Sequence, residues 1–211
     1  RCKGGVRAKT AACRGSLDAW QGRVADWVRR SRPEDLLNVD IFYDMYPVYG
    51  DHRLAVTLYA KAFDAARGEV SFAKALGERA ALPISPFTLF GGFHLEEGRI
   101  DLKRFALFPV VSFARALAIR HDVRARSTRE RLAGLSALGI GPEAELARLI
   151  SAHARVLKFM LRQQSRDLLA GIPVSNRVET AALSRDEQAE LRSALKAIQL
   201  VPDLVRDLMF G

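Results

Sequence analysis

Apolar residues with helical spacing dominate the second half of the chain and restrict it to a mainly helical fold. The longest run begins after Pro142 and continues to Gly171, with apolar residues three, four or seven positions apart. They are Leu146, Leu149, Ile150, Leu157, Met160, Leu161 and Leu168. A stripe of this kind buries one side of a helix against its neighbours. We therefore predict one long helix here, with its stripe in a core.

Helix-start and helix-stop signals divide the rest of this half into further helices. Two capping boxes of the form S-x-x-E precede apolar runs: Ser127 with Glu130, and Ser184 with Glu187. Pro109 suits the first turn of a helix that runs to about Arg120, and Pro202 should end or kink the last helix. From about residue 104 onward, the sequence predicts an antiparallel helix bundle.

The first half carries weaker helical signals. Ser16 is a plausible N-cap for a helix that Pro33 closes, and Asp51 can cap a second helix that ends near Gly68. A short helix is predicted over residues 70–80.

The period changes between Pro83 and Lys103. Short aromatic and aliphatic runs alternate there with Gly-Gly and Glu-Glu-Gly breaks, which predicts a small hairpin or loop.

The stretch NVDIFYDMYPVYGD, residues 38–51, looks like a strand because its side chains fit a period of two. That period puts Val39, Ile41, Tyr43 and Met45 on one face, and Asp40, Phe42, Asp44 and Tyr46 on the other. Aspartate is disfavoured in strands, so Asp40 and Asp44 on one face require solvent, a metal or a basic partner. A solvated edge strand is the simpler explanation.

Composition narrows the possible partners. The 211 residues have a net charge of +9, and residues 99–131 hold nine Lys/Arg against three acids. This favours an anionic partner, although a solvated helix face would look the same. Nucleic acid is unlikely as that partner, because the aromatic residues are not interleaved with the arginines. No run is long enough to cross a membrane.

Cysteine and histidine usage points away from disulfides and zinc. Cys2 and Cys13 are the only cysteines, and the four histidines are scattered. A cytoplasmic location is therefore expected. No signal peptide is visible, and the start at Arg1 resembles the interior of a longer chain.

Several stretches together resemble one family. They are CKGGV, RGSLDAW, LLNVDIFYDMYPVYGD, IDLKRFALFPVVSFARALAIRHDV, STRERL and LRQQ followed by ALS. In this order they are similar to the carboxyl-terminal part of the nucleotidyltransferases of bacterial signal transduction. Those enzymes resemble protein-PII uridylyltransferase and usually carry cyclic-nucleotide-binding and CBS domains ahead of the transferase.

The resemblance implies two domains and a function. Residues 1–51 would be the end of a nucleotidyltransferase catalytic domain, and residues 52–211 a helical substrate-binding domain. The full-length enzyme would move a nucleoside monophosphate from an NTP to a protein or small-molecule acceptor, with Mg²⁺. The family's Gly-Ser signature and first pair of metal-binding aspartates are not found here, so this chain alone is expected to be inactive.

The resemblance also selects residues. Asp44 matches a third catalytic carboxylate that would help to hold Mg²⁺, with Asp40 as its neighbour on the metal side. The residues matching the family's substrate-binding domain are Lys103, Arg115, Arg131 and Gln164, with Asp101 expected to orient Lys103 or Arg115. An internal ion-pair network is the alternative role for the charged ones, and a buried contact between helices is the alternative for Gln164.

A second function remains open. The bundle could be a non-catalytic regulatory module that docks an anionic partner protein through residues 99–131. Met45 and Tyr46 favour this alternative, because the family usually has an aromatic or aliphatic residue and then Arg after the carboxylate at Asp44.

Overall fold

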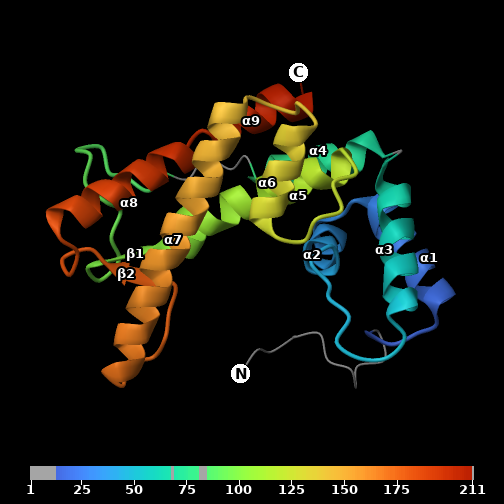
Figure 1. Cartoon of the computed structure of the whole chain (residues 1–211), viewed down its shortest axis with the longest axis horizontal. Coiled ribbons are helices and arrows are strands. Elements are labelled where there is room, and N and C mark those ends of the chain that lie inside the picture. Colours follow the sequence, from blue (N-terminus) through green and yellow to red (C-terminus); the bar gives the residue numbers. More distant parts are fainter. Residues whose placement is uncertain (1–12, 68, 81–84, 211) are drawn as a thin grey trace. The chain divides into compact units, whose positions relative to one another are not determined.

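The computed structural model describes residues 13–67, 69–80 and 85–210, and these residues are mainly helical (Figure 1). The predicted mainly-α fold is therefore confirmed. Contacts divide the chain into two compact units, Arg1–Phe72 and Ala73–Gly211, and each is described by itself. The predicted boundary after residue 51 stays a prediction.

The described residues of the first unit form three complete helices. They are α1 (Leu17–Arg30), α2 (Pro33–Phe42) and α3 (His52–Arg67). Ser16 caps α1 as predicted, since its hydroxyl accepts the N–H of Ala19 at 3.2 Å. Asp51 precedes α3 and accepts the N–H of Arg53 at 2.9 Å.

Aromatic rings fill the core of this unit. Phe42, Tyr43, Tyr59 and Phe63 are buried and in ring contact, and Trp20 and Trp27 of α1 pack on Phe42. The Tyr43 hydroxyl donates to the carbonyl of Ala62 at 2.7 Å, and the Tyr59 hydroxyl donates to the carbonyl of Tyr43 at 3.1 Å. Burial raises the pKa of Tyr43, so the hydroxyl keeps its proton.

The strand predicted within residues 38–51 is wrong, because α2 runs through it to Phe42. The buried side chains have helical spacing, whereas Ile41, expected on the covered face of the strand, is 53% exposed. The buried apolar positions are Leu36, Val39, Phe42 and Tyr43. Pro33 at the start and the ion pair of Arg32 with Asp35 at 2.8 Å favour the helix.

The second unit holds the bundle and a small sheet. Its elements are β1 (Arg99–Asp101), a π-helical turn (Lys103–Leu107), α5 (Phe108–Arg120), α6 (Thr128–Ala137), α7 (Glu143–Leu169), β2 (Arg177–Glu179), α8 (Arg185–Ile198), α9 (Val201–Val205) and a second π-helical turn (Arg206–Phe210). The helix α4 (Val70–Ala80) crosses the division between the units. The helix α5 is buried over most of its length, and α6 packs on it.

The sheet joins segments that are far apart in sequence. β1 pairs antiparallel with β2, with Ile100 opposite Val178, beside α7 (Figure 1). In the described part of residues 83–103, the predicted hairpin is reduced to single bridges of Phe87 with Phe93 and of Glu96 with Arg99. The strand partner of β1 therefore comes from residues 177–179.

Most helix ends of the bundle lie where the sequence signals put them. Ser127 accepts the N–H of Glu130, and Ser184 and Glu187 form a complete reciprocal capping box. Pro202 differs from the prediction: α8 has already ended at Ile198, and the proline begins the short helix α9.

The buried hydroxyl of Tyr43 offers a test of the first core. Tyr43→Phe should lower the free energy of unfolding of this unit by about 1 kcal/mol, because it removes one buried hydrogen bond. Denaturant unfolding followed by tryptophan fluorescence reports on this unit, since both tryptophans, Trp20 and Trp27, lie in α1. Tyr49→Phe is the control, because Tyr49 is 99% exposed. Equal stability of the two variants would contradict this packing.

Candidate functional site

The two predicted metal-binding aspartates lie at the end of α2. Asp40 is half-buried in its last turn, and Asp44 is exposed just after the helix. They do not share a strand face. Among residues 13–67, 69–80 and 85–210, no three His, Cys, Asp or Glu side chains gather where they could hold a metal ion. The described residues therefore do not fit a complete Mg²⁺ site.

Two of the predicted substrate-binding residues form internal hydrogen bonds beside the β1–β2 sheet. Asp101 accepts the backbone N–H of Arg104 at 3.0 Å, so it caps the turn that leads into α5. Gln164 of α7 donates to the carbonyl of Ser175 at 3.0 Å, just before β2. Both side chains therefore help to hold the sheet and its flanking segments in place.

The three predicted cations lie on three successive elements and differ in exposure. Lys103 is exposed beside β1, whereas Arg115 and Arg131 are 7% and 1% exposed on α5 and α6. The helical path from Lys103 to Arg115 is twelve residues, or about 18 Å at the usual rise. Arg131 donates from Nε to the carbonyl of Ala125 at 2.9 Å, which fixes the loop before α6.

Much of the basic segment 99–131 is engaged inside its own unit. Arg120 donates to the carbonyl of Met209 at 2.7 Å, and Arg124 pairs with Asp122 at 2.8 Å. The charge count of this segment therefore overstates the positive charge that a partner would meet.

A charged network fastens β1 and β2 to α7. Arg99 donates two hydrogen bonds to Asp167, at 2.8 and 3.0 Å, and Gln163 donates to the same carboxylate at 2.9 Å. Gln163 also accepts the N–H of Glu179 at 3.2 Å. Because Arg99 and Gln163 donate to it, the pKa of Asp167 is held below its ordinary value. An internal ion-pair network of the predicted kind therefore exists, but it is formed by Arg99 and Asp167 and not by the charged residues selected from the sequence.

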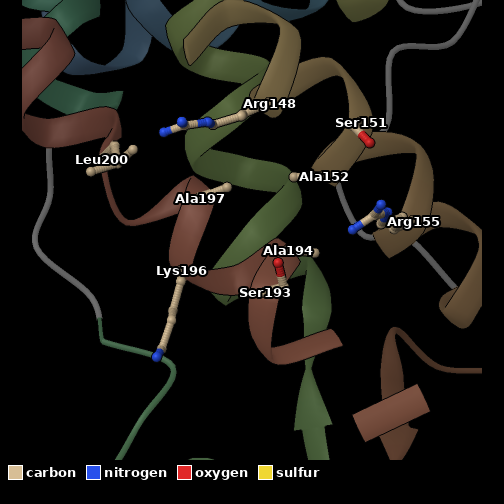
Figure 2. Close-up of a pocket in the computed structure, with 9 residues that line it drawn as sticks. All are labelled: Arg148, Ser151, Ala152, Arg155, Ser193, Ala194, Lys196, Ala197 and Leu200. Carbon is tan, nitrogen blue, oxygen red and sulfur yellow. The ribbon is translucent and has the colours of Figure 1, made fainter. Parts of the chain in front are cut away.

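The strongest candidate for a binding site is a groove between α7 and α8. It has a volume of about 440 Å³, within the range of small-molecule pockets. Its lining is Arg148, Ser151, Ala152 and Arg155 of α7, Ser193, Ala194, Lys196 and Ala197 of α8, and Leu200. Figure 2 shows small side chains between the two helices and three cationic side chains around them. No carboxylate is among these lining residues.

The positive charge of the groove has a structural cause. A row of ion pairs between α7 and α8, here called the ion-pair seam, stops before it reaches Arg148. Arg148, Arg155 and Arg162 are seven residues apart, so they share one face of α7. Arg162 pairs with Glu187 of α8, and Arg155 lies 3.6 Å from Glu190.

These pairings show that α7 and α8 are antiparallel, since the residue number falls on one helix as it rises on the other. At the next position along the seam, the α8 residues lining the groove are Ala194 and Ala197 instead of a carboxylate. Within the part of the chain that the structure describes, neither Arg148 nor Lys196 forms an ion pair. The seam thus ends in uncompensated positive charge.

The seam also affects the pKa of Glu187. Glu187 accepts from Arg162 and from the backbone N–H of Ser184, and together they lower the pKa of Glu187 to about 2. The carboxylate therefore stays charged at neutral pH and keeps α8 fixed against α7 below the groove.

The sequence interpretation missed Arg148, Arg155 and Lys196. The sequence does contain a signal for them. Three arginines lie seven residues apart on the longest helix, and only two of them, Arg155 and Arg162, have a glutamate partner on α8. Finding it requires knowing that α7 and α8 lie side by side, which is a tertiary fact.

Loss of the charge on Asp167 should destabilise the second unit. Asp167→Asn leaves Arg99 without its carboxylate, so the Tm at pH 7 should fall by several degrees. Since the folded-state pKa of Asp167 is lowered, its stabilisation is present above about pH 4 and is lost as the pH falls through the folded-state value. The Tm difference from wild type, followed by far-UV circular dichroism, should therefore shrink towards pH 2. Glu97→Gln is the exposed control, and a pH-independent difference would contradict the ion pair.

Asp40 and Asp44 should not create a metal site in this chain. Asp44→Asn should leave Mg²⁺ binding by the 211-residue chain unchanged in calorimetric titration. Tight Mg²⁺ binding that Asp44→Asn abolishes would show that the described carboxylates suffice after all.

Comparison with known proteins identifies the second unit. The profile of a family described as "putative nucleotidyltransferase substrate binding domain" matches residues 71–208, more than half of the chain. Neither the curated proteins nor the solved structures gave a match. No described helix is both long and apolar enough to traverse a bilayer. The chain belongs to the putative nucleotidyltransferase substrate binding domain family.

Proposed function

We propose that residues 71–208 bind a phosphate-bearing substrate, the nucleoside triphosphate, for a nucleotidyltransferase, and that the groove between α7 and α8 is the binding site. Two observations together carry this proposal: the chain belongs to this family, and the matched region holds a groove lined by three cations, of which only Arg155 forms an ion pair among the described residues. Arginine forms paired hydrogen bonds with phosphate oxygens, and lysine adds a mobile point charge. The groove offers both.

The lining chemistry supports anion binding over other uses. Ser151 and Ser193 can donate hydroxyl hydrogen bonds, and the alanines leave room for a ligand between the helices. The groove has no acid–base pair and no metal-binding group among its described lining residues. Its role in this proposal is therefore to hold the substrate, and no step of the reaction depends on it.

The transfer itself is assigned to a catalytic domain of the kind that the resemblance implies. In that setting the acceptor would be a protein or small molecule, and Asp44 would contribute one carboxylate among others. Regulatory cyclic-nucleotide-binding and CBS domains, and a place in bacterial signal transduction, belong to the same proposal. Because Asp40 and Asp44 do not fit a complete Mg²⁺ site, no step here is derived through the metal.

Docking of an acidic partner protein is the second candidate. It is favoured by the exposed side chains of Lys103 and Arg129 on the basic segment. Charge reversal at Arg129 would impair this docking and leave nucleotide binding intact.

Charge reversal in the groove tests the proposed function. Arg148→Glu and Lys196→Glu in the 211-residue chain should each weaken nucleoside triphosphate binding at least tenfold in calorimetry, because each replaces attraction by repulsion. Lys158→Glu, an exposed lysine of α7 that does not line the groove, is the matched control. Absence of binding, or binding that none of the groove variants alters, would contradict the proposal.

A further inference from the structure

The three cations of the groove are arranged along it and not around one point. Arg148 and Arg155 are two helical turns apart, which is about 10 Å along α7. Lys196 lies on the opposite wall, and in Figure 2 the charged ends of the three side chains point to separate positions. A single phosphate would leave part of this charge without a partner.

The lining provides little for a nucleoside. No aromatic side chain is among the described residues of the groove, so it has no ring on which a base could stack. Leu200 is the one large apolar side chain there, and the two serine hydroxyls can equally well donate to phosphate oxygens.

We infer that the groove recognises a linear chain of phosphates and not the nucleoside attached to it. This inference rests on the proposed function, because it specifies which part of the substrate the same site binds. The phosphate chain would lie where the seam ends. Its negative charges would face Arg148, which has no carboxylate opposite it on α8. The phosphate chain of a nucleoside triphosphate and free polyphosphate present the same chemistry, and the experiment below separates them.

Glu190 competes with this ligand for Arg155. The pair is 3.6 Å long and partly exposed, with side-chain accessibilities of 43% for Arg155 and 33% for Glu190, so it is weak. Neutralising Glu190 should release Arg155 to the groove and improve binding of the phosphate chain. This gives a variant that gains affinity, which loss of folding cannot imitate.

The test compares orthophosphate, pyrophosphate, tripolyphosphate, AMP, ATP and UTP by calorimetry with the 211-residue chain at fixed ionic strength without Mg²⁺. Affinity should rise at least tenfold from orthophosphate to tripolyphosphate. Tripolyphosphate, ATP and UTP should agree within about threefold, because the nucleoside adds no contact. AMP should bind no better than orthophosphate.

Variants locate the effect. Arg148→Gln and Lys196→Gln should weaken tripolyphosphate binding by about three- to tenfold each, and Glu190→Gln should strengthen it by about threefold. Arg129→Gln and Lys158→Gln each remove one positive charge outside the groove and should leave tripolyphosphate binding unchanged. Equal losses in the control variants would show non-specific attraction and overturn the inference.

The outcomes for the two proposals differ. If ATP and UTP bind through Arg148 but tripolyphosphate does not, the inference fails and the proposed function stands. If tripolyphosphate binds through Arg148 while ATP and UTP do not, the nucleotide function fails and polyphosphate recognition stands. Affinity independent of chain length would overturn the inference outright.

Discussion

The antiparallel contact of α7 with α8, along which the ion-pair seam runs, is the interaction on which the groove depends. Arg162 of α7 pairs with Glu187 of α8, and the weaker pair of Arg155 with Glu190 follows in the same antiparallel register. Glu187 also closes the capping box that starts α8, so one carboxylate sets both where the helix begins and where it lies. The seam stops before Arg148, and this leaves the groove positively charged.

The network around Asp167 supports this arrangement from the other end of α7. It ties Arg99 of β1 and the backbone of β2 to the helix, so a two-stranded sheet too small to be stable alone is held in place. Asp101 and Gln164, selected from the family resemblance, belong to the same neighbourhood and make internal hydrogen bonds. These hydrogen bonds give both residues a structural role that does not require contact with a substrate.

The helices could be predicted from sequence because their signals are local. Ser16, Ser127 and Ser184 cap helices as their spacing indicates. The stripe predicted along α7 is buried at Leu146 and Leu149, but its members Leu161 and Leu168 are exposed. The strand at residues 38–51 was wrong because aromatic and branched residues imitate a period of two, whereas Pro33 and the packing of Phe42 and Tyr43 select a helix.

The groove could not be predicted because it depends on which two helices are neighbours. Arg148 alone looks like any exposed arginine, and only the alanines opposite it on α8 distinguish it from Arg155 and Arg162. The density of charge in residues 99–131 was misleading for the same reason: Arg99, Arg120 and Arg124 find their partners in the folded chain.

The central claim, that the end of the α7 and α8 seam binds phosphate chains, is tested most directly by mapping where the ligand binds. Backbone amide resonances of the ¹⁵N-labelled chain would be followed during titration with tripolyphosphate. Saturable shifts should concentrate in residues 148–155 and 193–200. Shifts concentrated in residues 99–131, or scattered in proportion to exposed charge, would contradict the account.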